Sequence, residues 1–300
     1  MTSRFSLSKS IDGFTLNCQA RRLSPFTIRD YTNTLNKLTD FLNDKSIDEV
    51  TRADLLNFLS VQEVSKKTLY NYHIGLSVFF KWCLSEKLIT ENPLAGIPRP
   101  KPEQRTIQPI PENHIRAILQ AVERVTYERD GKTVTAYLPD RYRNRALILL
   151  LLDTGIRASE LCKIQRKDLD LANRSVKVIG KGRKERILYF SPTTAQAIWK
   201  YDIGESEYLF SSSRNRPLDR NNLRHILERI CDRANVPRYS PHDFRHTFAV
   251  NFLRNYPNIY ALQQMLGHST LDMVKRYLAI SESDVADAHR HASPVENWNL

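Results

Sequence analysis

The chain has 300 residues, of which 41% are hydrophobic and 26% charged, as in a globular protein that buries its own core. It has no apolar run of the roughly 18 residues that a membrane span needs, and its N-terminal stretch lacks the apolar core of a signal peptide, so we expect a cytoplasmic protein with no membrane partner. Lys and Arg number 45 against 33 Asp and Glu, a formal net charge of +12, which favours a polyanionic partner.

Helical signals occupy the first hundred residues. Three helix starts are recognisable, each a capping residue followed by apolar residues at helical spacing: Ser24 with Pro25, Thr51 with Asp54, and Ser65. A fourth, short helix is expected around 84–90. We therefore predict a small helical domain over 1–100.

The stretch IPRPKPEQRTIQPIP, residues 97–111, separates this domain from the rest of the chain. It contains five prolines, and proline fixes φ and lacks an amide donor, so neither a helix nor a central strand runs through it. We interpret it as a linker, which places a second domain at 112–300.

The second domain alternates helical and strand signals. We expect a helix at 112–125, a hairpin around the Asp-Gly pair in 126–140, an apolar helix at 141–153, strands at 167–171, 175–180 and 184–190, and helices from 193 to 280. A tail follows at 280–300. The predicted fold class is mainly α with one small antiparallel β-sheet.

Four stretches of the second domain carry side chains suited to chemistry. They are TGIRASEL with Arg157 at a helix start, VIGKGRKERI with Lys181 at a glycine-flanked hairpin tip, SPHDFRHTFA with His242 and Arg245 on one helix face, and LGHSTLDMVKRYL with His268 and Tyr277. Taken singly, each has an ordinary structural explanation: an arginine at a helix end, a solvated turn lysine, a polar first turn and a core tyrosine. The lysine loop lacks the spacing of the phosphate-cradling loop of ATPases.

Taken together, these side chains fit the attack of an oxygen on a phosphodiester. Guanidinium groups stay protonated, and each can bind the non-bridging phosphate oxygens through two parallel N–H donors. An imidazole accepts a phenol proton, and an ammonium group protonates a leaving alkoxide. A tyrosine nucleophile then gives a covalent phosphotyrosyl intermediate, which conserves the bond energy and needs no ATP.

At these residues the chain resembles the tyrosine recombinase, or phage-type integrase, family of the Xer and Cre type. The resemblance implies a site-specific DNA recombinase (integrase) that cleaves and rejoins DNA through a 3′-phosphotyrosyl intermediate, with no metal, ATP or other cofactor. It implies six catalytic residues, in chain order Arg157, Lys181, His242, Arg245, His268 and Tyr277.

The family implies a role for each of these residues. Its two arginines bind the scissile phosphate, and Lys181 protonates the departing 5′-oxygen. His242 hydrogen-bonds the phosphate or accepts the tyrosine proton, His268 contributes a further hydrogen bond, and Tyr277 becomes joined to the 3′-phosphate. Glu160 is a candidate to orient the first arginine, which lies three residues before it.

The resemblance also implies architecture and partners. A helical core-binding domain and an α-rich catalytic domain are expected to clamp double-stranded DNA at short core sites, in the cytoplasm at the nucleoid. The protein is expected to be a monomer when free and a homotetramer on two duplexes during synapsis, with the tail at 280–300 docked on a neighbouring protomer. Candidate DNA contacts are Lys66, Lys67 and Tyr70 in the first domain and Arg220, Asn221 and Arg224 in the second.

Two other functions use parts of the same pattern. A non-catalytic DNA-binding regulator would explain the glycine between two helical runs in ALQQMLGHSTLDMVKRYL as a helix-turn-helix, yet it has no need of Arg157 or Lys181. A type IB topoisomerase uses similar chemistry but relaxes supercoils as a monomer. A metal-dependent transposase is disfavoured because the sequence shows no set of acidic metal-ligand motifs, and the four scattered cysteines predict buried, reduced thiols. The 126–140 segment is longer than in compact family members, which leaves its role open.

Overall fold

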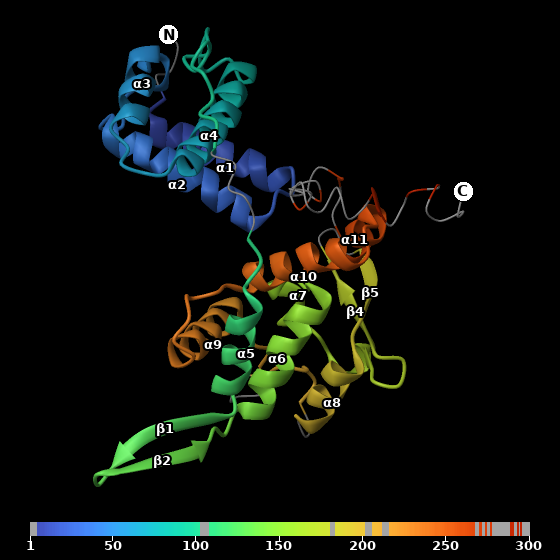
Figure 1. The fold of residues 1–300 in the computed structure, drawn as a ribbon. Helices are drawn as coiled ribbons and strands as arrows, with labels where there is room; N and C mark the ends of the chain where they lie inside the picture. Colours follow the sequence, from blue (N-terminus) through green and yellow to red (C-terminus); the bar gives the residue numbers. More distant parts are fainter. Residues whose placement is uncertain are drawn as a thin grey trace. The chain divides into compact units, whose positions relative to one another are not determined.

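The computed structural model divides into two compact units, Met1–Arg105 and Thr106–Leu300, each built around a hydrophobic core of its own (Figure 1). The residues that it describes are 5–102, 108–180, 184–201, 206–211, 216–267, 270, 271, 274, 277, 289, 290, 293 and 295. Lys181, His268 and most of the predicted tail lie outside these residues. Among the described residues, no helix combines the length and the apolar character that crossing a bilayer requires.

The first unit is helical. Its elements are α1 (Leu7–Ala20), α2 (Pro25–Phe41), the 3-10 turn η1 (Ile47–Glu49), α3 (Arg52–Ser60) and α4 (Lys66–Ser85). All three predicted helix starts are confirmed: the Ser24 and Ser65 hydroxyls each accept a backbone N–H three residues on, and Thr51 forms a reciprocal capping box with Asp54.

Two features of the first unit differ from expectation. Helix α1 was not predicted, although Ser6 caps it and Leu7, Ile11 and Phe14 bury one face at helical spacing. The fourth helix expected around 84–90 is wrong, because α4 runs on to Ser85 and residues 86–90 form turns instead. Helix α4 is long because its apolar face stays buried as far as Cys83.

The second unit contains the remaining elements. They are α5 (Glu112–Ala121), β1 (Arg124–Arg129), β2 (Lys132–Tyr137), α6 (Arg141–Thr154), α7 (Ala158–Leu161), η2 (Arg166–Asp168), β3 (Leu169–Asp170), β4 (Ser175–Ile179), β5 (Glu185–Tyr189), α8 (Pro192–Lys200), α9 (Arg220–Arg233), α10 (Pro241–Asn255) and α11 (Ile259–Leu266). The predicted class, mainly α with one small antiparallel sheet, is confirmed, and the β1–β2 hairpin adds a second small sheet. All four cysteines are free and buried, and burial raises the pKa of the Cys83 and Cys162 thiols to about 12.

Two antiparallel sheets belong to this unit. The hairpin β1–β2 turns through Asp130 and Gly131, both at positive φ, as the Asp-Gly pair predicts, and it projects from the body of the unit (Figure 1). The other sheet has the order β3-β4-β5, with a 3-10 turn in place of the first half of the expected 167–171 strand. Val178 pairs with Arg186 in this sheet, which brings an arginine onto the same inward face as the buried Leu188.

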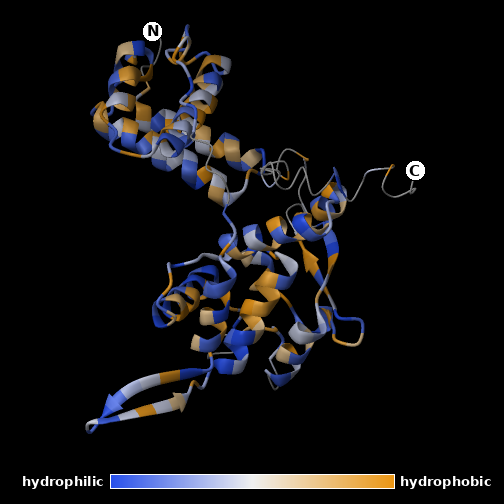
Figure 2. Cartoon of the chain, viewed as in Figure 1, coloured by the Kyte–Doolittle hydropathy of each residue, from blue (hydrophilic) through white to orange (hydrophobic). Residues whose placement is uncertain are grey.

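Helix α6 runs through the centre of the second unit, and its stretch from Ala146 to Leu152 is hydrophobic (Figure 2). It ends at Gly155, which adopts a left-handed conformation with φ +58°. A Cβ atom built at Gly155 would lie 2.5 Å from Cδ1 of Phe248 on α10 and 3.0 Å from Leu266 at the end of α11. Because Gly155 has no Cβ atom, α6, α10 and the end of α11 can pack closely together just before Arg157.

We predict that Gly155→Ala destabilises the protein by about 2–4 kcal/mol, because a left-handed alanine costs roughly 1 kcal/mol and overpacking adds about 1–3. Gly131→Ala is the matched control: its φ is +73°, but a Cβ there meets nothing within 4 Å, so only the conformational cost of about 1 kcal/mol applies. Urea unfolding of both variants checks this, and equal losses would contradict the steric argument.

Candidate active site

A buried carboxylate organises one side of the site. Glu160 lies in α7 with its side chain only 3% exposed. Arg157, the residue just before α7, donates Nη1 to Glu160 Oε1 at 2.9 Å and its backbone N–H to Oε2 at 3.1 Å. From strand β5, Arg186 donates Nη1 to Oε1 at 2.8 Å and Nη2 to Oε2 at 2.7 Å. Glu160 thus orients the predicted phosphate-binding arginine directly, and it is itself held by a second arginine, Arg186, that sequence reasoning missed.

The protonation of Glu160 follows from these contacts. Burial acts to raise the pKa of the carboxyl, but the hydrogen bonds and charge of Arg186, with the hydrogen bonds from Arg157, overcome it and hold the pKa below its ordinary value. The carboxylate therefore stays ionised at neutral pH, and the two guanidiniums keep their geometry.

Three consecutive carbonyl groups at the end of α11 each accept a hydrogen bond from a different arginine. Arg186 Nε donates to Met265 O at 2.9 Å, Arg245 Nη2 to Leu266 O at 2.8 Å, and Arg157 Nη2 to Gly267 O at 2.8 Å. The last carbonyls of a helix have no partner within the helix and carry its negative dipole end, so they suit cationic donors. This arrangement draws three arginines from distant parts of the chain to one point.

Gly267 makes the close approach possible. Its φ is +62°, and a Cβ atom there would lie 3.0 Å from Nη1 of Arg186 and 3.3 Å from Nη1 of Arg157. A larger residue would push both guanidiniums away from the carbonyls.

Arg245 is the most buried cation of the site. It lies in α10 with 3% exposure and also donates Nη1 to Gly155 O at 2.7 Å. Burial, together with the charge of Arg157, lowers its pKa to about 10, while Tyr277 and Glu160 act in the opposite direction. At neutral pH the guanidinium is still protonated, and it sits near both Arg157 and Tyr277.

The hydroxyl of Tyr277 lies 2.9 Å from Nδ1 of His246. His246 is one helical turn after His242 on α10, and the two imidazole rings are 4.0 Å apart between centroids. The ring of Tyr277 packs on the small apolar cluster that includes Leu262 and Val274. The tyrosine is therefore held against α10, and the histidine beside its oxygen is one that sequence reasoning missed.

The structure brings most of the predicted site residues together. Arg157, Glu160, Arg245 and Tyr277 share one region, and His242 joins them through His246, whereas Lys181 and His268 lie outside the described residues. Signals for the two missed residues exist in the sequence: Arg186 alternates with Leu188 on the inward face of a strand, and His246 follows the His-x-x-Arg motif at helical spacing from His242.

The candidate DNA contacts lie on exposed surfaces. Lys66 and Lys67 are exposed in the first turn of α4, where the Lys67 ammonium lies 4.8 Å from the Tyr70 ring. Arg220, Asn221 and Arg224 are exposed near the start of α9, which Asp219 caps. No group of three His, Cys, Asp or Glu side chains within the described chain is placed to hold a metal ion.

Comparison with known proteins decides the family. The model of the phage integrase family matches residues 109–284, and that of the phage integrase N-terminal SAM-like domain matches residues 11–90. The chain belongs to the phage integrase family. It is similar to the tyrosine recombinase XerC of Leptospira interrogans, 31% identical over 73% of this chain and 70% of that protein, and to XerC of Bacillus pumilus, 28% identical over 91% and 92%.

Solved structures of other integrases share the fold of this recombinase. A XerH recombinase bound to its difH substrate has a TM-score of 0.73 at 22% identity, covering 95% of this chain and 84% of that one. A Tn1549 transposon integrase in complex with DNA has a TM-score of 0.74 at 21% identity, covering 96% and 99%. The family membership and the XerC relatives make the chain a DNA-cleaving and rejoining enzyme of the tyrosine type. They favour a recombinase over the alternative hypotheses of a non-catalytic regulator and of a topoisomerase.

We predict that Glu160→Gln destabilises the recombinase by about 3–5 kcal/mol at pH 7, because it breaks a buried ion pair on one side only. The folded-state pKa of Glu160 is below its ordinary value of 4.5, so its stabilisation is complete above that value and is lost as pH falls through the folded pKa.

The difference between the two proteins should therefore shrink on acidification, as urea unfolding from pH 7 downward measures. Glu112→Gln is the control, since Glu112 and its partner Arg116 are 77% and 73% exposed and should contribute almost nothing. A difference that does not change with pH would contradict the assignment.

Proposed function

We propose that this enzyme is a site-specific recombinase of double-stranded DNA in which Tyr277 attacks the scissile phosphate. The tyrosine oxygen forms a bond to phosphorus, the bond from phosphorus to the 5′-oxygen breaks, and a 3′-phosphotyrosyl link remains. Attack by a 5′-hydroxyl from another strand reverses these steps and rejoins the DNA. The number of phosphoester bonds is unchanged, so no ATP is required.

The single observation that carries this proposal is the position of the Tyr277 hydroxyl, hydrogen-bonded to His246 and close to Arg245. A tyrosine bonded to an imidazole and close to a phosphate-binding guanidinium has both a proton acceptor and an oriented target.

The arginines are assigned to the phosphate. Arg157 and Arg245 are anchored to the ends of α6 and α11, which fixes their forks before DNA arrives. Each guanidinium has five N–H donors in one plane, which match the non-bridging oxygens of a phosphodiester as charge builds up on them. Glu160 and Arg186 act as positioning residues that hold Arg157 in place.

The proton transfers are assigned to two further groups. His246 receives the proton of Tyr277, because it is the imidazole bonded to that hydroxyl, and His242 supports the imidazolium or bonds the phosphate. Lys181 gives its proton to the departing 5′-oxygen, and His268 adds a hydrogen bond to the phosphate. The last two roles follow from the family resemblance.

DNA contacts are assigned to both units. In the first, Lys66, Lys67 and Tyr70 bind the backbone, aided by Arg99, whose guanidinium lies 5.8 Å from the Tyr70 ring. In the second, α9 presents Arg220, Asn221 and Arg224 to a major groove. We expect short core sites of double-stranded DNA, bound in the cytoplasm at the nucleoid.

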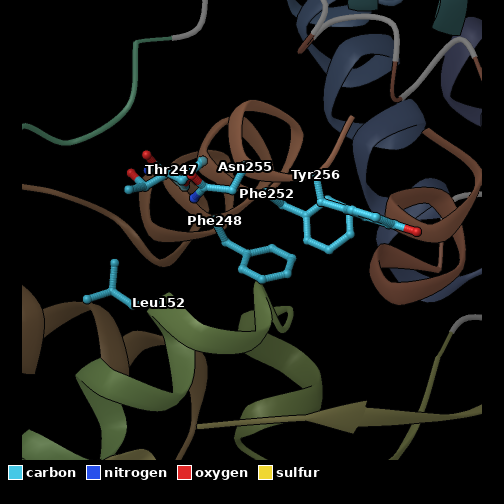
Figure 3. A pocket seen from close by; sticks show the side chains of 7 residues that line it. Leu152, Thr247, Phe248, Phe252, Asn255 and Tyr256 are labelled. Carbon is cyan, nitrogen blue, oxygen red and sulfur yellow. The ribbon is translucent and has the colours of Figure 1, made fainter. Parts of the chain in front are cut away.

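The proposed assembly is a homotetramer on two duplexes, formed from monomers. A pocket of about 290 Å³ on α10 supports it, with the rings of Phe248, Phe252 and Tyr256 gathered along its side (Figure 3). We assign this pocket to apolar residues of the 280–300 tail of a neighbouring protomer. Its aromatic lining suits such residues, and Tyr256 is 58% exposed in the isolated chain.

The proposed nucleophile is tested by Tyr277→Phe, which removes one hydroxyl and leaves the ring in its apolar cluster. We expect DNA binding to be retained and covalent attachment to be lost. A nicked suicide substrate reports attachment as a slowly migrating protein–DNA band in a denaturing gel. A band of wild-type intensity from the variant would overturn the assignment.

The proposed base is tested with His246→Asn and His246→Ala. Asparagine can keep a hydrogen bond near the Nδ1 position but cannot take a proton, whereas alanine does neither. We expect both variants to cleave about 10²–10⁴-fold more slowly near neutral pH, with the rate of each still rising toward pH ~10 as the tyrosine ionises by itself. The wild-type rate should instead level off above the imidazole pKa. A wild-type pH profile for His246→Asn would reduce His246 to a positioning residue.

A further inference from the structure

A cleft of about 260 Å³ lies between α6 and α8, next to the root of the β1–β2 hairpin, where its two strands join the body of the unit. The side chains that line it include Tyr137 at the end of β2, Arg141, Tyr142 and Arg145 in the first turns of α6, and Lys200 in the last turn of α8. The cleft therefore joins the hairpin, whose role the sequence leaves open, to two helices of the catalytic unit.

Arginine guanidiniums contact the two tyrosine rings of the cleft. The guanidinium of Arg124 lies 4.7 Å from the centroid of the Tyr137 ring, that of Arg141 lies 5.0 Å from the same ring, and Arg141 is also 4.4 Å from the Tyr142 ring. Arg124 donates to the Tyr137 hydroxyl at 2.8 Å, and Arg141 donates to Leu138 O at 3.2 Å. The rings thus hold two guanidiniums in fixed planes.

The cleft carries a strong positive charge. Three cations, Arg141, Arg145 and Lys200, line it with one carboxylate, Glu123, which is paired with Arg145 at 2.9 Å, and a fourth cation, Arg124, contacts the Tyr137 ring. The hairpin tip is balanced by contrast, since Glu128 and Asp130 offset Arg129 and Lys132. The excess of positive charge therefore lies at the root of the hairpin and not at its tip.

This cleft is separate from the catalytic residues. It lies at the start of α6, whereas Arg157 follows the other end of that helix, and 14 residues of α-helix span about 21 Å (Figure 1). A phosphate held by Arg157 and Arg245 cannot reach it, so the ligand of the cleft is a different group.

We propose that the α6–α8 cleft binds the phosphodiester backbone of a second DNA segment, either DNA flanking the core site or another duplex. Planar guanidiniums fixed on aromatic rings offer paired donors that match the two non-bridging oxygens of a diester, and Lys200 adds a mobile cation. This inference rests on the proposed function, which already brings DNA to this unit. A second DNA segment is therefore present at high effective concentration.

The test measures duplex binding by full-length protein carrying Tyr277→Phe, so that no covalent complex accumulates. Arg141→Ala with Lys200→Ala removes two cations from the cleft, and Arg116→Ala with Lys132→Ala removes two exposed cations outside it. Each protein is titrated with a short core duplex and with the same core extended by about three helical turns on each side. Bead-bound core duplex then measures capture of a second, labelled duplex.

We expect the cleft variant to bind the short duplex as its parent does. On the extended duplex, or in capture of the second duplex, it should lose roughly tenfold in affinity, with the slope of log K against log[salt] reduced by about two. The control pair should show neither change. A loss in the flanked arm alone assigns the cleft to flanking DNA, and a loss in the capture arm alone assigns it to another duplex.

Three outcomes would overturn the proposal: equal losses on short and extended duplexes, no loss in either arm, or an acidic peptide that binds the cleft while added DNA does not compete. Failure of the parent protein to bind the short core duplex would count instead against the proposed function. Arg141→Lys, which keeps the charge and removes the planar fork, should fall between the parent and the double variant. Far-ultraviolet circular dichroism and the melting temperature confirm that each variant is folded.

Discussion

The catalytic unit depends on one buried carboxylate shared by two arginines. An ionised Glu160 with a side chain 3% exposed is tolerated only because Arg157 and Arg186 satisfy both of its oxygens. Those partners come from the start of α7 and from β5, and each also bonds a carbonyl at the end of α11. The requirement to neutralise one charge therefore fixes the relative positions of two helices and a strand around the Arg157 guanidinium.

The end of α11 has a complementary role in arranging the site. Its last carbonyls need donors, and three arginines supply them in succession at Met265, Leu266 and Gly267. The same segment leads toward Tyr277, whose ring rests on the cluster formed by α10 and α11. One arrangement thus satisfies the end of α11 and positions Tyr277, the proposed nucleophile. The burial that lowers the pKa of Arg245 to about 10 still leaves it charged.

Helix α6 relates the catalytic residues to the rest of the unit. Its apolar length fills the core, its C-terminal end at Gly155 accepts a hydrogen bond from Arg245, and its first turns carry the arginines of the α6–α8 cleft. A rigid helix thus separates the two cationic regions, which we propose bind two different phosphate groups, by a fixed distance.

The sequence by itself determined the helix caps, the Asp-Gly hairpin, the mainly helical class and the order of Arg157, His242, Arg245 and Tyr277, because caps, turns and motifs are local in the chain. Only the tertiary structure decided which side chains meet. Arg186 reaches Glu160 across 26 residues, and His246 bonds Tyr277 across 31, since such contacts depend on how strands and helices pack and not on spacing. The α6–α8 cleft likewise exists only because folding brings the hairpin root onto two helices that are separated along the chain.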